Sequence, residues 1–399
     1  MKRLVFIFVA LFLFLPLVRA RELPVDITAD AAILINLDEE ETIYEKNADK
    51  QEILASLTKV MSAYTVLQRV DNLNRKVTIR ESDISNLDGF TCAGLEVGSS
   101  VSYLDLLYAM ILPSGADASK ALAIHVAGSE EKFKNMMNEE VEKLGLRYTH
   151  FEDSYGGDDN NVSTARDYSI LLREALKNKT FKKVFSSNHY TLSNGLEVFN
   201  YTRNYAIYHG LDPDLITGNK SGYTPEAGLL LASTATINGV NYALVICKAQ
   251  ENEKLSQHVL DTYKVYDYVS NHHYEKRTLI EKGAVLGKIN VVDGTTSEYV
   301  ITAQRNITKV LSDEDFEEVN YDYNLASELT SKNKIGDNLG YVDILVGDDV
   351  IATYNVNLKD QLYDKKVESK KMVVVIIVLG FVILVLLCAN LFSVEKVKK

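Results

Sequence analysis

The stretch Ser56-Leu-Thr-Lys59 could supply a nucleophile and the base that activates it. Its serine and lysine lie one turn apart, on one face of a helix. A serine hydroxyl attacks poorly at its free pKa, and a lysine kept neutral by burial or a nearby cation can take its proton. Free N–H groups at a helix start also favour negative charge on such a serine. The pattern is weak alone, because Ser129-Glu-Glu-Lys132 and Ser331-Lys-Asn-Lys334 match it too.

A second stretch could add another hydroxyl group. Leu112-Pro-Ser-Gly-Ala-Asp-Ala118 follows an apolar helix expected at 104–112. Its proline and glycine predict a tight loop that presents the Ser114 hydroxyl. The ordinary structural alternative is a turn between helices with Ser114 as a cap, and Ser56 could be an N-cap in the same way. A cap would explain either serine, but it would not explain Lys59.

A third stretch could bind an anionic group. Gly218-Asn-Lys-Ser-Gly-Tyr-Thr224 leads into an apolar strand. Gly222 would let a ligand backbone lie against the strand edge, while Lys220 and Thr224 offer a cation and a hydroxyl to a carboxylate. The alternative is an ordinary strand start with an exposed lysine. The three stretches together favour a serine acyl-transfer site.

Both ends of the chain carry apolar segments. A basic start and an uncharged run over 4–18, ahead of Val18-Arg-Ala20, predict a signal peptide over 1–20. Residues 372–394 carry no charge and are long enough to cross a bilayer. An exported chain would stop there, so we expect a single transmembrane helix at 372–394, a cytoplasmic tail at 395–399 and an extracytoplasmic catalytic domain.

Composition narrows the possible partners. The net charge of −12 makes nucleic acid and anionic membrane surfaces poor partners. Cys388 lies in the predicted membrane helix, which leaves Cys92 and Cys247 as either one disulfide or two buried thiols. The seven histidines are scattered, without a His-Glu-x-x-His pattern. The sequence therefore predicts no metal site.

The pattern of expected helices and strands along the sequence predicts two domains. Up to residue 272, helical patterns alternate with short strands, and Asn238-Gly239 indicates a hairpin. Beyond that point, short strands and turns follow one another. We therefore expect a catalytic domain over 21–272 and a small all-β domain over 277–364. Apolar periodicity predicts helices at 57–64 and 104–112 and after the capping box at 164–167.

The order and spacing of the three stretches resemble those of the D-alanyl-D-alanine carboxypeptidase family of low-molecular-weight penicillin-binding proteins. The likeness covers about residues 25–360 and includes Ala31-Ala-Ile-Leu-Ile-Asn-Leu-Asp38, Ile43-Tyr-Glu-Lys-Asn47 and Ser163-Thr-Ala-Arg-Asp167. It implies an α+β, β-lactamase/transpeptidase-like catalytic domain, with an antiparallel sheet flanked by helices and a helical lobe. A small all-β domain and one C-terminal transmembrane helix would follow.

The resemblance also assigns catalytic roles. Ser56 would be the acylated nucleophile, Lys59 its base, and Ser114 the relay that passes a proton to the departing D-alanine. The backbone N–H groups of Ser56 and Tyr223 would form the oxyanion hole. The substrate would be the peptidoglycan pentapeptide, β-lactams would be covalent inhibitors, and no cofactor is implied. The substrate-binding residues would be Lys220, Ser221, Gly222, Tyr223 and Thr224.

One position departs from the family pattern. The second motif usually reads Ser-x-Asn, whereas this chain has Ala116 in the third place. The lost amide contact would cost about 1–3 kcal/mol, which slows an enzyme without abolishing its activity; a water or Asp117 could fill part of the gap. We therefore expect a serine-type D-Ala-D-Ala carboxypeptidase. One alternative is a weak or inactive cell-wall-binding protein. The other is a serine β-lactamase, although the predicted β domain and membrane anchor argue against it.

Overall fold

A computed structural model of the chain describes residues 25–254 and 256–396, and side chains up to residue 386. The predicted signal peptide and the last three residues lie outside the described part. The chain divides into two compact units. The first runs to Lys276 and includes Val310–Asp313, and the second contains Arg277–Lys309 and the chain from Glu314 onward.

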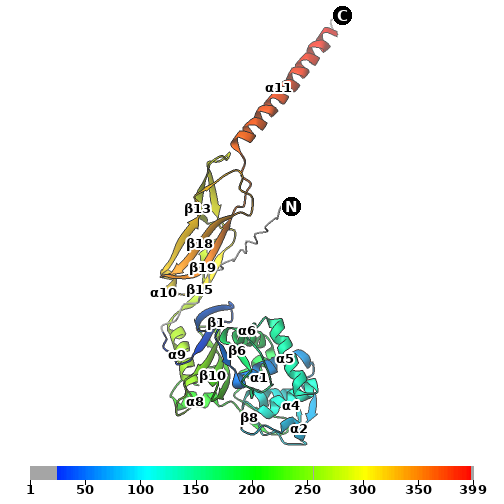
Figure 1. Cartoon of the computed structure of the whole chain (residues 1–399), viewed down its shortest axis with the longest axis vertical. Helices are drawn as coiled ribbons and strands as arrows, with labels where there is room; N and C mark the ends of the chain where they lie inside the picture. Colours follow the sequence, from blue (N-terminus) through cyan, green and yellow to red (C-terminus); the bar gives the residue numbers. More distant parts are fainter. Residues whose placement is uncertain (1–24, 255, 397–399) are drawn as a thin grey trace, which may run out of the picture. The chain divides into compact units, whose positions relative to one another are not determined.

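An antiparallel five-stranded sheet organises the first unit (Figure 1). Its strand order is β2-β1-β11-β10-β9, so β9 forms one edge. Asn238 and Gly239, both at positive φ, close the β10–β11 hairpin that the sequence predicted. The strands are β1 (Ala31–Asn36), β2 (Glu41–Lys46), β9 (Gly218–Thr224), β10 (Gly228–Ile237) and β11 (Val240–Ala249).

Both faces of this sheet are buried. Ile33 of β1 faces the larger core, which the helical lobe shares, whereas its neighbour Leu34 faces the core on the opposite side. This alternation follows from the two-residue period of a strand. The helices α8 (Thr202–Tyr208) and α9 (Gln257–Asn271) cover this opposite face. The helices of the lobe are α1 (Thr58–Arg69), α2 (Glu81–Ile84), α3 (Tyr103–Ile111), α4 (Ala116–Ala127), α5 (Glu130–Leu144), α6 (Ala165–Leu176) and α7 (Lys179–Phe185).

Short elements complete the first unit. One half of the predicted capping box is confirmed, because Thr164 Oγ1 accepts a hydrogen bond from Asp167 N at 3.0 Å where α6 begins. The Asp167 carboxylate instead accepts hydrogen bonds from Tyr148 N at 2.7 Å and Thr149 Oγ1 at 3.0 Å. Three two-stranded pairs brace the lobe, and a 3₁₀ turn, η1 (Ala55–Leu57), precedes α1. The pairs are β3 (Gln51–Ile53) with β6 (Val162–Thr164), β4 (Lys76–Thr78) with β5 (Ser100–Ser102), and β7 (His189–Thr191) with β8 (Glu197–Phe199).

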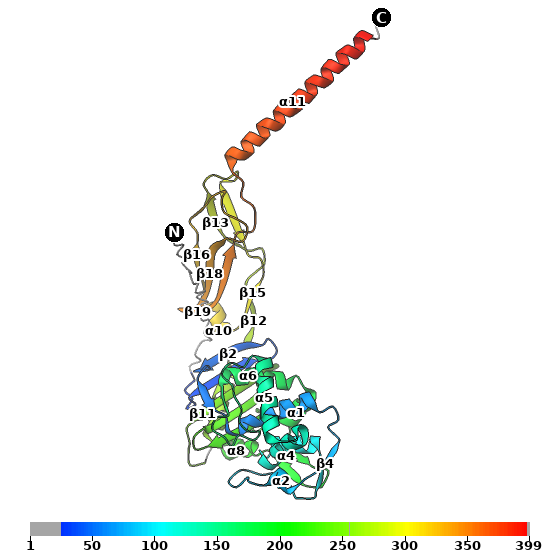
Figure 2. The same cartoon turned by 45° about the vertical axis from the view of Figure 1, so that its right-hand side comes forward.

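The second unit is built from β-strands, as expected, and Figure 2 shows β16, β18 and β19 side by side. Val342 and Ile344 of β18 are fully buried in its core. The strand pair β12 (Tyr274–Ile280) and β15 (Ile307–Ser312) crosses the boundaries between the units. One sheet is β14 (Glu298–Thr302), β13 (Val285–Val291) and β17 (Glu328–Leu329); the other is β16 (Val319–Leu325), β18 (Asn338–Val346) and β19 (Asp349–Asn357), with α10 (Asp313–Glu317) before it.

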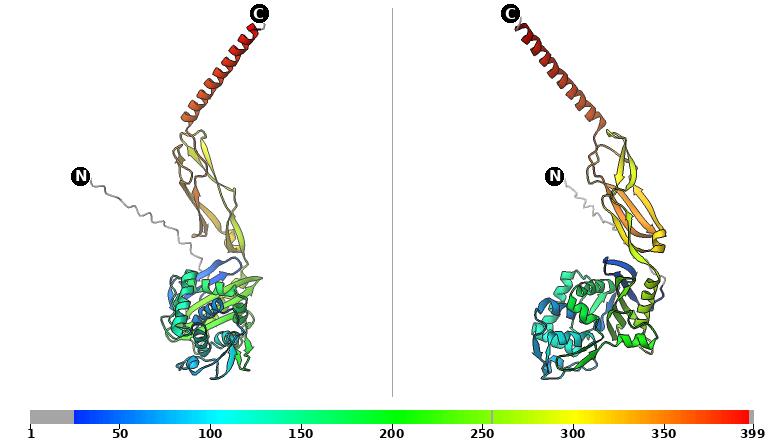
Figure 3. Two further views of the ribbon diagram at one scale, coloured as in Figure 1. Left: turned by 90° about the vertical axis from the view of Figure 1, so that its right-hand side faces the viewer. Right: turned by 180° about the vertical axis from the view of Figure 1, so that it is seen from behind.

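The chain ends in a long continuous helix, α11 (Lys365–Lys396), which is unbroken in both views of Figure 3. Within its segment Lys365–Leu386, the most apolar stretch of 18 residues has a mean hydropathy of 2.5, and none of that stretch is buried. This segment is long and apolar enough to be a candidate membrane span. The helix contains the whole of the predicted span, residues 372–394.

Candidate active site

Ser56 lies in η1, immediately before α1, and faces the lysine one turn on. The Nζ of Lys59 lies 2.9 Å from Ser56 Oγ and donates to it. The N-cap of α1 is Leu57, and no side chain caps this helix. The structural alternative for Ser56, an N-cap, is therefore wrong. Its hydroxyl is instead engaged by the lysine of the same motif.

Lys59 is buried, with 2% of its surface exposed. Its Nζ also donates to the backbone carbonyl of Tyr155 at 2.6 Å. Burial lowers the pKa of Lys59 to about 7, while the negative charges of Asp153 and Asp117 act in the opposite direction. A large fraction of Lys59 is therefore neutral near pH 7, and in that form its lone pair can accept the Ser56 proton.

A tight turn after Phe151 delivers the Tyr155 carbonyl to Lys59. The Asp153 carboxylate accepts hydrogen bonds from the backbone N–H groups of Tyr155, Gly156, Gly157 and Asp158 at 2.5–2.8 Å. Gly156 has φ +87°, and a Cβ there would lie 1.8 Å from Ala55 O. Only glycine fits this close approach. The sequence analysis missed this turn, although the pair of glycines after an Asp was a usable signal.

Ser114 and Lys220 form a second serine–lysine contact from distant parts of the chain. Lys220 Nζ donates to Ser114 Oγ at 2.9 Å and to the carbonyl of Ser221 at 2.6 Å. The N-cap of α4 is Gly115, without a side-chain cap, so the interpretation of Ser114 as a cap is also wrong. Ser114 has φ +67°, an uncommon conformation for a serine that aims its hydroxyl at Lys220.

Lys220 is as deeply buried as Lys59, also 2% exposed. Burial, and then the charge of Lys59, lower the pKa of Lys220 well below its usual value. The alternative interpretation of Lys220, an exposed lysine at an ordinary strand start, is therefore wrong. A positive charge on the amine of Lys59 makes protonation of the Lys220 amine less favourable, and the reverse also holds. The two lysines therefore lose their protons in steps that belong to the pair.

Strand β9 passes close to the backbone of the nucleophile. A Cβ on Gly222 would lie 3.2 Å from Ser56 N, tighter than an ordinary contact. The glycine predicted to admit a ligand backbone thus also admits the chain's own backbone at Ser56. This close approach places β9 beside the backbone N–H of Ser56.

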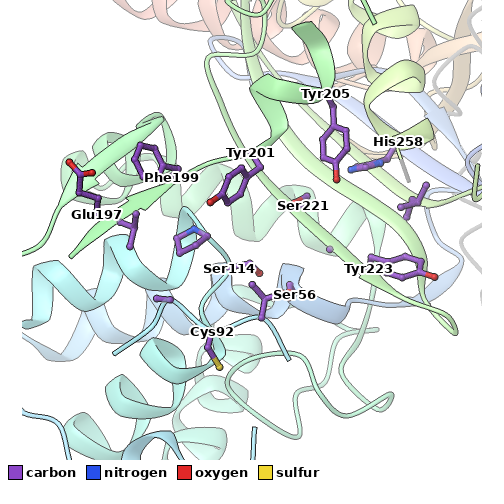
Figure 4. A pocket seen from close by; sticks show the side chains of 16 residues that line it. Ser56, Cys92, Ser114, Glu197, Phe199, Tyr201, Tyr205, Ser221, Tyr223 and His258 are labelled. Carbon is purple, nitrogen blue, oxygen red and sulfur yellow. The ribbon is translucent and has the colours of Figure 1, made fainter. Parts of the chain in front are cut away.

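These residues surround a cavity of about 500 Å³ (Figure 4). Ser56, Ser114, Ser221, Gly222 and Tyr223 line it, whereas Lys59, Lys220 and Thr224 do not. Thr224 Oγ1 instead accepts a hydrogen bond from Ala227 N at 3.1 Å in the turn after β9. The remaining walls come from loops, from β8, from the start of β10 and from α8 and α9, and most of these residues were not predicted from the sequence because they come from separate parts of the chain. They are Thr91, Cys92, Ala93, Pro113, Glu197, Val198, Phe199, Tyr201, Tyr205, Leu229 and His258.

The two other Ser-x-x-Lys matches have structural roles. Ser129 Oγ accepts from Lys132 N and caps α5. Ser331 Oγ donates to the Asp293 carboxylate at 2.9 Å. Neither lies in the cavity. Burial of the lysine, rather than the pattern, distinguishes Ser56.

Ala116 is buried at the first position of α4 and does not line the cavity. The neighbouring Asp117 accepts hydrogen bonds from the N–H groups of Ala93, Gly94 and Leu95 at 2.7–3.0 Å. Asp117 thereby holds the loop that carries Cys92 and Ala93 into the cavity wall. Its influence on Lys59 is electrostatic.

The two cysteines in the described part of the catalytic unit are free. Cys247 is buried in β11, and its neighbours Leu244 and Val245 are fully buried too. Cys92 is exposed and lines the cavity. Both sequence alternatives are therefore wrong, since there is no disulfide between them and Cys92 is not a buried thiol.

Comparison with known proteins identifies the family of the chain. The family model described as D-alanyl-D-alanine carboxypeptidase matches residues 18–251, and the model of the penicillin-binding protein 5 C-terminal domain matches residues 274–368. The D-alanyl-D-alanine carboxypeptidase DacF of Bacillus subtilis is 26% identical over 342 residues, which cover 84% of this chain and 86% of that protein.

Two further relatives come from other bacteria. A D-alanyl-D-alanine carboxypeptidase of a Streptomyces species is 35% identical over 218 residues, covering 50% of this chain and 73% of that protein. The crystal structure of penicillin-binding protein 5 from Haemophilus influenzae superposes with a TM-score of 0.62 at 25% identity, covering 86% of this chain and 99% of the other.

Fold and site thus define a serine hydrolase of the penicillin-binding protein fold, with a catalytic domain and a C-terminal all-β domain. The chain belongs to the D-alanyl-D-alanine carboxypeptidase family.

Proposed function

We propose that this enzyme removes the terminal D-alanine from peptidoglycan stem pentapeptides through an acyl-enzyme on Ser56. The observation that carries the proposal is the buried contact of 2.9 Å between Lys59 Nζ and Ser56 Oγ, open to a cavity of about 500 Å³. The names of the curated relatives support the substrate class.

In this proposal the reaction has two stages, acylation of Ser56 and hydrolysis of the resulting ester. Neutral Lys59 takes the Ser56 proton as Oγ attacks the carbonyl carbon of the penultimate D-alanine. The resulting oxyanion is held by the backbone N–H groups of Ser56 and Tyr223. The C–N bond then breaks, and the leaving amine takes up the proton that Lys59 accepted, passed on through the Ser114 hydroxyl. Water then attacks the ester carbonyl while Lys59 takes one of its protons. The ester C–O bond breaks, and that proton returns to Ser56 Oγ as the shortened peptide leaves.

β-Lactams would enter by the same route. Their ring amide takes the place of the peptide bond, so attack by Ser56 opens the ring and leaves an ester on the serine. The departing amine stays tethered to the acyl group and cannot diffuse away. We therefore expect penicillin to form a long-lived adduct.

The chain is further proposed to be anchored by α11, with its catalytic unit on the extracytoplasmic side. The candidate span within α11 and the basic, apolar start of the sequence support this topology. A chain ending at residue 371 should lose membrane association and keep penicillin binding. Aggregation of that truncated chain, with a well-behaved full chain in detergent, would contradict an anchor role.

One observation favours a second candidate, a cell-wall-binding protein with little turnover. Ala116 stands where the family pattern has an amide side chain, and it does not line the cavity. The two functions differ in D-alanine release and agree in penicillin acylation.

D-alanine release from a synthetic peptide ending in D-Ala-D-Ala tests the proposal. Wild type should release D-alanine and Ser56→Ala should not, while Ser129→Ala should match wild type because Ser129 only caps a helix. Acylation by penicillin without any D-alanine release would leave the cell-wall-binding alternative in its place.

A further inference from the structure

One backbone carbonyl joins the helices α1 and α4 to the turn that contacts Lys59. The carbonyl oxygen of Ser154 accepts hydrogen bonds from Ser62 Oγ of α1 and from Ser119 Oγ of α4, each at 2.5 Å. Both serines are fully buried, and Ser154 is 2% exposed. Ser62 Oγ also lies 3.7 Å from Met137 Sδ, but a hydroxyl has a single hydrogen, which the nearer oxygen takes. Both lone pairs of the carbonyl oxygen are therefore used.

The two serines come from the helices that follow the nucleophile and the relay. Ser62 lies one turn after Lys59 on the same face of α1. Ser119 lies in the first turn of α4, five residues after Ser114. A serine within a helix often bonds to the preceding turn of its own helix. These two instead reach a carbonyl that is 92 and 35 residues away along the chain, so they connect both helices to one turn.

The next residue of that turn contacts the base. Tyr155 follows Ser154 directly, and its carbonyl accepts from Lys59 Nζ at 2.6 Å. A neutral amine has two N–H bonds and one lone pair. With one N–H donated to the Tyr155 carbonyl, the lone pair can face Ser56 Oγ, as a general base requires. The direction of the Tyr155 carbonyl therefore helps to orient the lone pair of Lys59.

We propose that Ser62 and Ser119 are positioning residues for the base Lys59. By holding the Ser154 carbonyl, they keep the neighbouring Tyr155 carbonyl directed at the amine. This inference rests on the proposed acyl-enzyme mechanism and adds two residues that act on the base through the backbone. Either hydroxyl alone leaves the Ser154 carbonyl paired, whereas loss of both leaves a buried acceptor without a partner. The effects of the two serines should therefore be strongly non-additive.

The test measures the pH dependence of penicillin acylation in Ser62→Ala, Ser119→Ala and the double variant. Each single variant should stay within about threefold of the wild-type rate, and the double variant should slow by about ten- to a hundredfold. The hydrogen bond to the Tyr155 carbonyl favours the protonated form of Lys59, so weakening that bond should lower the pKa of Lys59. The acid limb of the double variant should therefore move toward lower pH.

The acid limb distinguishes positioning from a general loss of structure. The titratable groups that act on Lys59 are Asp153, Asp117, Cys92 and Lys220, and all four are kept in these variants. A merely structural disturbance would lower the rate and the melting temperature without moving the limb. An unmoved limb in the double variant, or equal rates in the single and double variants, would overturn the inference.

Thr65→Val is the matched control. Thr65 is a fully buried residue of α1, and its Oγ1 has no hydrogen-bond partner among the described residues. The replacement removes a buried hydroxyl from the same helix with little change in shape, so this variant should acylate as wild type and keep the acid limb in place. A shifted limb in Thr65→Val would mean that any change in α1 has this effect, and it would overturn the inference.

A second measurement does not depend on catalysis. The backbone N–H groups of residues 155–158 donate to Asp153 in this turn. Their hydrogen exchange should become about tenfold faster or more in the double variant and stay unchanged in Thr65→Val. Unchanged exchange in the double variant would contradict the inference.

The same data separate this inference from the proposed function. If wild type takes penicillin but releases no D-alanine, the proposed function fails. A shifted limb and faster exchange in the double variant would still uphold the positioning role. A wild type that takes no penicillin would overturn both.

Discussion

The two serine–lysine contacts of the site have the same N–O distance, 2.9 Å, and very different surroundings. Ser56 and Lys59 come from one helical turn, and Asp153 and Asp117 moderate the effect of burial on Lys59, whose pKa is about 7. Ser114 and Lys220 are 106 residues apart. Burial and the charge of Lys59 both lower the pKa of Lys220.

The difference shows how the same type of serine–lysine contact can have two roles in one site. Carboxylates near Lys59 keep its pKa close to neutrality, where a general base works best. Lys220 instead donates a hydrogen bond to the Ser114 hydroxyl, and a charge on Lys59 opposes its protonation. In the proposed mechanism, the first pair supplies the nucleophile and its base, and the second holds the proton relay in place.

Removing Lys220 should have the largest effect. In Lys220→Ala, the Ser114 hydroxyl loses the amine that donates to it, so penicillin acylation should slow by about a hundredfold or more. Stopped-flow or mass-spectrometric acylation rates measure this. Lys132→Ala, from a chance match to the motif, is the control and should behave as wild type. A near-wild-type rate in Lys220→Ala would show that the second pair is dispensable.

Changing Asp153 should shift a pH profile. The charge of Asp153 raises the pKa of Lys59 against the effect of burial, so Asp153→Asn should lower that pKa further. Neutral Lys59 would then persist to lower pH, and the acid limb of the acylation rate should move toward lower pH. Asp159→Asn, an exposed change in the same loop, should leave the limb in place. Movement toward higher pH would contradict the assignment of Lys59 as the base.

Ala116→Asn should have the smallest effect on rate, and a negative one. Ala116 is 1% exposed and lies outside the cavity, so a longer side chain should overpack α4 and cost about 1–3 kcal/mol of stability. Thermal unfolding and D-alanine release together measure this. Ala116→Ser adds a polar atom with little volume and should be tolerated. A gain in turnover for Ala116→Asn would instead mean that the missing amide limits the enzyme.

Local patterns predicted much of the fold. Helix α1, the β10–β11 hairpin and the Thr164 cap all follow from periodicity or turn chemistry within a few residues. The pairing of Ser114 with Lys220 needs a long-range contact, and only the family resemblance brought the two together.

The parts of the site that sequence reasoning missed share a physical reason. Tyr155 contributes a backbone carbonyl, which has no side-chain signature. Asp153 acts through backbone N–H groups in a loop, and His258 lies on a helix of the opposite face of the sheet. The chance motif at Ser129 shows the converse, because its pattern is right but its lysine is exposed to solvent.

The central claim is that Ser56, activated by Lys59, carries the acyl group. Intact-mass measurement of the protein after penicillin, followed by peptide mapping, tests it most directly. The account predicts one penicilloyl adduct on the peptide containing Ser56 and none in Ser56→Ala. An adduct that persists in Ser56→Ala, or one that maps to Ser129 or Ser331 in wild type, would contradict it.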